Sequence, residues 1–200
     1  MRVMLFDRTC TTTGRLPLGL SHSWLVGGRL YRGLGRLDRC HAIGSWAEGL
    51  DRLASFDRID EVQYWGHGNW GLARVANESL DRRALVPGHP LHARLEAVRE
   101  RMAPQAQWWF RTCDTLGARA GHAFGQAWSD FFGRPVAGHT HIIGLWQSGL
   151  HRLEPGCAPH WPASEGITEG TPERPVRSTW SLPSAPNTIH MLQGRVPDGW

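Results

Sequence analysis

Short hydrophobic runs alternate with amphipathic segments over most of the chain. The short runs predict buried strands, and they lie at 3–7, 40–44, 61–65, 108–113 and 136–143. The amphipathic segments repeat apolar residues every three or four positions and predict helices at 46–56, 90–102 and 117–132. Such an alternation is typical of parallel strands joined by crossover helices. The pattern therefore predicts an α/β protein, a three-layer α/β/α sandwich with a mostly parallel central sheet.

Local residue types refine this picture. Ser45 stands directly before the first amphipathic segment, where its hydroxyl can cap a helix. The segment 20–36 is rich in glycine and ambiguous, and 70–75 fits either a short returning strand or a loop.

The amino-acid composition of the chain changes after residue 153. Seven of its thirteen prolines lie between 154 and 186, and this density predicts irregular structure. We expect a domain at 1–153, followed by a Pro-rich C-terminal extension at 154–200 that packs on or near it as a wrapping or lid segment. Residues 189–192 either return as a final edge strand or belong to a partly disordered tail.

Two predicted strands end on residues that can do chemistry. The run at 61–65 leads into Gly66-His67-Gly68, and the run at 108–113 ends on Cys113. If these strands are parallel neighbours, both side chains emerge at the same carboxyl edge of the sheet, where open α/β folds place their sites. A thiol nucleophile beside an imidazole is then the leading hypothesis. The alternative is a buried cysteine that ends a core strand and an unrelated loop histidine.

This pattern resembles the caspase-like (caspase–hemoglobinase fold) cysteine peptidases, and within them the bacterial caspase-like domains of unknown function. The resemblance covers roughly residues 59–145, with a strand running into His67-Gly68 and a later strand running into Cys113. The cysteine follows the histidine by 46 positions, close to the roughly 50 of caspases. Arg111 and Thr112 stand where caspases have Gln-Ala before the cysteine, so aspartate specificity is not implied.

The resemblance implies a role for each of these residues. Cys113 would attack a carbonyl carbon as a thiolate, and His67 and the following helix would lower its pKa. His67 would act as general base and as proton donor to the leaving amine. The backbone N–H groups of Gly68 and Cys113 would form the oxyanion hole. The expected activity is that of a cysteine endopeptidase; the alternative is a noncatalytic domain of the same fold that binds a peptide or partner protein.

Substrate-binding residues are expected at the end of the first strand and just before the cysteine. The candidates are Asp7 and Arg111, together with Arg8. Asp7 would favour a basic substrate residue, whereas either arginine would favour an acidic one. The pattern leans toward Asp7, and all three could equally belong to surface ion pairs.

Composition limits the classes of partner. The net charge is +4, and the arginines are interleaved with acids. A nucleic-acid binder would cluster its arginines beside aromatic platforms. Arg29, Arg32, Arg36 and Arg39 approach that arrangement, but a solvated helix face explains them. We therefore expect a peptide or protein substrate and no nucleic acid.

The cellular setting is inferred from cysteines and hydrophobic runs. Four cysteines are widely spaced without a CxxC pair, which argues against a disulfide framework. No run approaches the ~20 apolar residues of a membrane-spanning helix. A soluble cytoplasmic protein is expected, with no membrane association.

The sequence also contains partial motifs for a metal site and for a nucleotide site. His139 and His141 alternate on a predicted strand, and Cys157 and His160 have CxxH spacing, but no further ligand completes either pair. The glycines around His67 are not followed by a helix pattern or a lysine that could hold phosphates. We therefore expect no metal and no cofactor.

Overall fold

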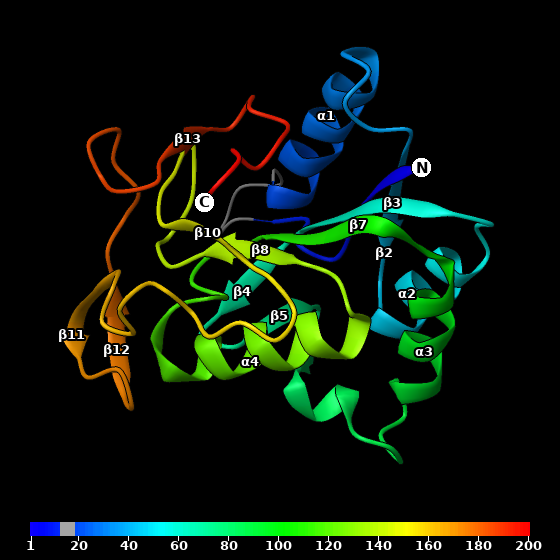
Figure 1. Ribbon diagram of the computed structural model, residues 1–200. Helices are drawn as coiled ribbons and strands as arrows, with labels where there is room; N and C mark the ends of the chain where they lie inside the picture. The colour runs from blue at the N-terminus through cyan, green and yellow to red at the C-terminus, as the bar shows by residue number, and fades with distance from the viewer. Residues whose placement is uncertain (13–18) are drawn as a thin grey trace.

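A six-stranded sheet forms the centre of the computed structural model, which describes residues 1–12 and 19–200 (Figure 1). All neighbouring strands in this sheet are parallel except the edge strand β10, which runs antiparallel to β8. In spatial order the strands are β10 (Leu150–Leu153), β8 (Val136–His139), β7 (Met102–Arg111), β3 (Ile59–Trp65), β1 (Arg2–Asp7) and β2 (Arg39–Ile43). The predicted α/β class with a mostly parallel central sheet is confirmed.

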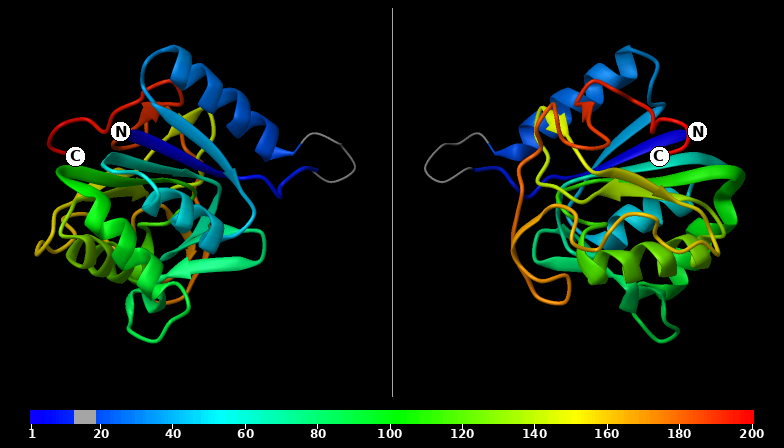
Figure 2. Two further views of the ribbon diagram at one scale, coloured as in Figure 1. Left: turned by 90° about the vertical axis from the view of Figure 1, so that its right-hand side faces the viewer. Right: turned by 60° about the vertical axis from the view of Figure 1, so that its left-hand side comes forward.

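Helices lie on both faces of this sheet (Figures 1 and 2). One face carries α1, which resolves the ambiguous segment 20–36 as a helix. The opposite face carries the other three α-helices. The bounds are α1 (Leu20–Gly33), α2 (Trp46–Ala54), α3 (His92–Arg101) and α4 (Ala118–Phe132). The predicted helices at 46–56, 90–102 and 117–132 are thus present with small shifts at their ends.

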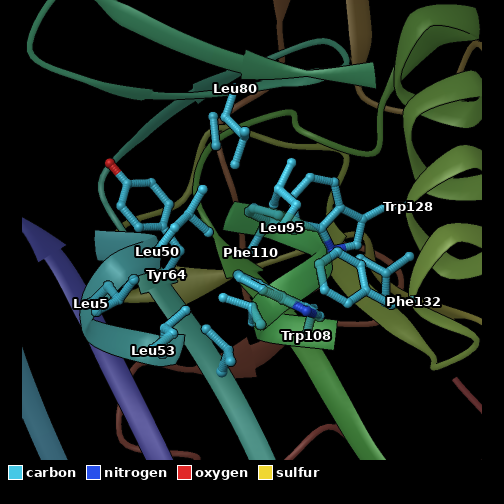
Figure 3. Close-up of a cluster of buried hydrophobic side chains, with 14 of the residues drawn as sticks. Leu5, Leu50, Leu53, Tyr64, Leu80, Leu95, Trp108, Phe110, Trp128 and Phe132 are labelled. Carbon is cyan, nitrogen blue, oxygen red and sulfur yellow. The ribbon is translucent and has the colours of Figure 1, made fainter. Parts of the chain in front are cut away.

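Alternating side chains of each strand supply two separate cores. Tyr64 and Trp108 point toward α2, α3 and α4, where they belong to the larger cluster of buried apolar residues (Figure 3). Trp108 meets Trp128 of α4 edge-on, with ring centroids 5.1 Å apart. Full burial of a large apolar side chain stabilises a fold by ~1.5–3 kcal/mol. The tryptophans of β7 and α4 are therefore core residues.

The second core lies on the α1 face. Met4, Phe6 and Trp65 pack against Tyr31 of α1. The helix approaches the sheet closely because Gly28 lacks a side chain: a Cβ there would lie 2.4 Å from the sulfur of Cys40. Beyond α1, the same face is covered by residues near the C-terminus (Figure 2).

Capping chemistry fixes the start of α2. The hydroxyl of Ser45 accepts a hydrogen bond from the backbone N–H of Glu48 at 3.1 Å. The predicted cap is therefore confirmed. An N-cap of this kind stabilises a helix by ~1 kcal/mol.

Shorter strands form three small sheets outside the central one. They are β4 (His67–Asn69), β5 (Leu72–Val75) and β6 (Glu78–Asp81); β11 (Ile167–Gly170) and β12 (Pro175–Ser178); and β9 (Trp146–Gln147) and β13 (Ile189–His190). A 3₁₀ helix, η1 (Arg82–Leu85), follows β6. The strand predicted at 136–143 ends earlier, at His139. The hairpin of β11 and β12 also shows that the extension, expected to be irregular, is partly ordered into strands.

The C-terminal extension is attached to the domain by a buried polar cluster. Glu165 accepts hydrogen bonds from the imidazole of His151 in β10 and from the Thr140 hydroxyl, both at 2.7 Å. Trp161 stacks on His151 with ring centroids 4.3 Å apart and donates a hydrogen bond to the Leu116 carbonyl. The extension therefore packs directly on residues of the domain.

No helix within residues 1–12 and 19–200 combines the length and the hydrophobicity needed to cross a lipid bilayer.

Candidate active site

The pairing of β3 with β7 positions the candidate histidine and cysteine. The two strands are parallel neighbours, and Trp65 is paired with Arg111 at their carboxyl ends. His67 and Cys113 each follow the paired residue by two positions. Both residues therefore leave the sheet at the same edge, as the sequence predicted.

One cavity of about 710 Å³ contains both residues in its lining. It opens on the α1 face, between α1 and segments near 143–147 and 191–192. Pockets that hold small-molecule or peptide-sized ligands have volumes of ~300–1,000 Å³. The cavity is therefore large enough to receive a substrate segment beside His67 and Cys113.

Gly68 brings the histidine segment against the cysteine turn. A Cβ at this position would lie 2.4 Å from the Thr115 hydroxyl, 2.6 Å from Cβ of Thr112 and 2.7 Å from the carbonyl oxygen of Cys113. Real Cβ atoms do not approach this closely, so only glycine fits here. The backbone of β4 and the turn that carries Cys113 are consequently in direct contact.

The thiol of Cys113 is largely enclosed. Burial raises its pKa to about 11, and the neighbouring carboxylate of Asp114 acts in the same direction. The expectation that His67 and the following helix lower this pKa is therefore wrong for the unliganded protein. The physical reason is loss of water around the sulfur, because a thiolate loses more solvation on burial than a thiol does.

The imidazole of His67 is exposed and faces a second cysteine. Its Nε2 lies 3.5 Å from Sγ of Cys10, and the edge of the ring meets Trp24 of α1 with centroids 5.6 Å apart. Cys10 was not predicted as a site residue. It follows β1, the parallel neighbour of β3, so the same strand-end argument that selected His67 could have selected it.

Asp114 follows the candidate nucleophile in an unusual backbone conformation. Its φ of 53° lies in the left-handed region, and its side chain is buried. Burial raises the pKa of this carboxyl to about 7, against the opposing influence of the Ser178 hydroxyl. Its N–H donates to the His141 carbonyl at 3.2 Å. A titratable group near neutral pH thus adjoins Cys113.

Arg111 lines the cavity, but internal partners engage its guanidinium. Its Nε and one terminal amino group donate to the Gln147 side chain at 3.1 and 2.7 Å, and the other amino group donates to the Tyr31 hydroxyl at 2.8 Å. The guanidinium also lies 4.5 Å from the ring centroid of Trp65 and 4.4 Å from that of Trp109. Arg111 is therefore a fixed part of the cavity wall, and burial lowers the pKa of its guanidinium.

Asp7 and Arg8 are not brought to the cavity. The Asp7 carboxylate accepts hydrogen bonds from the N–H and hydroxyl of Thr9, both at 2.7 Å, and from the N–H of Ala76 at 3.2 Å. Arg8 forms an exposed ion pair with Glu48 at 2.7 Å. The predicted lean toward Asp7 as the specificity residue consequently finds no support in the geometry.

The histidines considered as metal ligands have other partners. His139 is fully buried at the end of β8, and its Nδ1 lies 3.1 Å from the Ser148 carbonyl oxygen. His141 lies beyond the end of the strand and bonds the Thr140 hydroxyl. Across the part of the chain that the structure describes, no three His, Cys, Asp or Glu side chains are grouped so that they could hold a metal ion.

Comparison with known proteins does not assign a function, so the function is inferred from the geometry of the site. No protein-family model matches the chain, and no curated protein sequence is significantly similar to it. The resemblance to caspase-like peptidases therefore depends on the two motifs and on their positions in the fold.

Proposed function

We propose that the protein is a cysteine endopeptidase in which Cys113 is the nucleophile and His67 the proton-transfer partner. The observation that carries this proposal is the placement of both residues. They lie at equivalent positions beyond the paired ends of two neighbouring parallel strands, and they line the same cavity. A structural cysteine and an unrelated loop histidine would have no reason to share this edge.

The chemistry requires proton transfer within the substrate complex. Burial raises the pKa of the Cys113 thiol to about 11, so the protonated thiol is the predominant form at pH 7. Sγ therefore attacks the peptide carbonyl carbon as its proton passes to the His67 imidazole. The imidazolium then protonates the departing amine, which leaves an acyl-enzyme thioester. Water attacks the thioester, His67 accepts its proton, and the acid product and the thiol are released.

The developing oxyanion needs hydrogen-bond donors. The family resemblance assigns this role to the backbone N–H groups of Gly68 and Cys113. The close contact of Gly68 with the Cys113 turn supports it, because two donors that serve one oxygen must lie close together.

A noncatalytic peptide-binding domain is the second candidate. Two observations favour it: the thiol of Cys113 is protonated at neutral pH, and Nε2 of His67 faces Cys10 in the unliganded protein. Catalysis would require His67 to exchange Cys10 for Cys113 when substrate binds. Catalytic contacts in unliganded enzymes are often long or misaligned and tighten when the substrate binds.

A matched pair of cysteine variants tests the proposal. In a screen with internally quenched peptides, Cys113→Ala should lower kcat by at least ~10³-fold, because removal of a nucleophile abolishes the covalent route. Cys10→Ala should retain turnover within about threefold, because Cys10 contacts the imidazole without attacking the substrate. Both variants should keep the unfolding midpoint of the parent in urea.

Other outcomes would contradict the proposal in different ways. Undiminished turnover by Cys113→Ala would exclude Cys113 as the nucleophile. Loss of activity in Cys10→Ala alone would assign the nucleophile to Cys10, the thiol already in contact with His67. Peptide binding with no hydrolysis in the parent protein would identify the binding domain instead.

A further inference from the structure

We propose that the cavity beside Cys113 selects substrates with a large apolar side chain on the residue that precedes the cleaved bond. This inference rests on the proposed function, because it names the substrate class of the same site. It also makes a prediction about peptide binding that does not require catalysis.

The lining of the cavity is mostly apolar, and apolar side chains from three segments adjoin the ends of β3 and β7 that carry His67 and Cys113. The first, α1, presents an apolar face toward the cavity, with Trp24, Val26 and Leu30 among its lining residues. The loop after β8 adds Leu145, and the segment after β13 adds Met191. Several of these side chains remain partly in water in the unliganded protein: Leu145 is 69% exposed and Val26 is 63% exposed. An apolar substrate side chain would remove this surface from water.

The described residues that line the cavity offer a substrate no carboxylate and no unengaged guanidinium. None of the described residues that line the cavity is acidic, so a basic substrate side chain would meet no carboxylate there. The cavity's guanidinium, that of Arg111, already donates to Gln147 and Tyr31 and lies between two indole rings. An acidic substrate side chain would have to displace these partners. Burial of a charge without a partner is unfavourable, so both charged classes should bind less well than an apolar side chain.

The histidines at the cavity do not alter this conclusion. His22 is exposed on α1, so water competes with any contact between its side chain and a substrate. In the proposed mechanism, His67 transfers protons and does not bind the substrate side chain. The remaining polar groups of the lining are uncharged and can bond the peptide backbone.

The size of the cavity agrees with this substrate class. At about 710 Å³, it exceeds the space that one small side chain requires. Complete burial of a Leu or Phe side chain is worth enough to raise affinity by about 10- to 100-fold. Leucine, phenylalanine or tryptophan before the cleaved bond should therefore be preferred.

The test uses internally quenched peptides that differ only in the residue before the cleaved bond, with Leu, Phe, Trp, Asp or Arg at that position. The value of kcat/KM for the apolar peptides should exceed that for the Asp and Arg peptides by about 10- to 100-fold. Leu145→Glu should reduce the preference for Leu over Arg by about tenfold. The matched control is Val176→Glu, which changes an apolar residue of similar exposure, 64%, outside the cavity lining, and it should leave the preference unchanged.

A binding series separates this inference from the proposed function. The same five sequences, made as peptide amides without fluorophore or quencher, are titrated into Cys113→Ala while the heat of binding is recorded by calorimetry. Tighter binding of the apolar peptides supports the inference even if no peptide is cleaved by the parent protein, an outcome that would reject only the peptidase. Equal binding of all five, or a preference for Asp or Arg in either series, overturns the inference.

Discussion

At the scale of single residues, Asp114 combines two unfavourable features. A non-glycine residue at φ 53° is strained, although Asp and Asn tolerate this conformation better than most residues. Burial in addition raises the pKa of its carboxyl to about 7. The folded state therefore favours the protonated carboxyl group. As pH rises and this group must ionise, the free energy of unfolding decreases.

The sign of this effect gives a prediction for Asp114→Asn. Between about pH 4 and pH 7, Asp114 is protonated in the folded protein and ionised in the unfolded chain, so the parent protein should lose stability as pH rises through this window. Asparagine does not titrate and tolerates the backbone conformation. The variant should therefore be more stable than the parent at pH 8, by at most ~4 kcal/mol, with little difference at pH 4.

Urea unfolding at pH 4, 6 and 8 measures this dependence. Asp57→Asn, which alters an exposed carboxylate, should reproduce the pH dependence of the parent protein. An Asp114→Asn protein whose stability follows the same pH curve as the parent would show that the buried carboxyl does not titrate as described.

Residue chemistry was predictable from sequence only in part. His67, Gly68 and Cys113 were found because each stands at the end of a hydrophobic run or beside a glycine. The raised pKa of Cys113 was not predictable, because it arises from burial by segments distant in sequence. The contact between His67 and Cys10 depends likewise on the pairing of β1 with β3, which no local pattern encodes.

At the scale of elements, β4 must lie directly on the turn that carries Cys113. Gly68→Ala should force these two segments apart, because the new Cβ would overlap the Thr115 hydroxyl and the Cys113 carbonyl oxygen. We expect a loss of ~1–3 kcal/mol in the free energy of unfolding. Turnover should fall by at least about tenfold, since small displacements of catalytic groups are costly.

Gly33→Ala provides the matched control. A Cβ at Gly33, at the end of α1, would meet no atom within 4 Å. This variant should be neutral or slightly stabilising in urea, since alanine favours the helix. Full activity in Gly68→Ala would mean that the contact between β4 and the cysteine turn does not organise the site.

Most elements with a hydrophobic pattern were predicted, whereas β10 and the hairpin of β11 and β12 were missed. The segments that became β1, β3, α2 and α4 carry clear hydrophobic patterns over their full lengths. β10 has four residues, and the hairpin of β11 and β12 is largely exposed, so neither has a pattern that could identify it. The position of β10 depends on its pairing with β8, and β11 and β12 pair with each other, instead of following from local preference.

At the scale of the whole molecule, the C-terminal extension contributes to the folded core. Trp161 is 4% exposed, stacks on His151 and bonds the Leu116 carbonyl. Trp161→Ala should therefore lower the free energy of unfolding by ~3–5 kcal/mol. Trp180→Ala should change it by less than ~0.5 kcal/mol, because that side chain is 66% exposed.

Chemical unfolding followed by circular dichroism measures both tryptophan variants. If the two substitutions have equal and small effects, the extension is only loosely attached. The sequence predicted that this segment would pack on or near the domain, but it gave no sign of the His151 and Glu165 pair. That pair joins two residues from different parts of the chain, and neither stands in a recognisable motif.

The residues that cover β10 also affect how the protein can associate with copies of itself. An edge strand with free backbone N–H groups is a template for strand addition and aggregation. Here the N–H groups of Leu150 and Arg152 donate to the carbonyl oxygens of Asn187 and Trp200. A second chain could pair with this edge only after the C-terminal residues were displaced. The chain therefore protects one edge of its own sheet, and side-by-side growth of the sheet is directed to the opposite edge at β2.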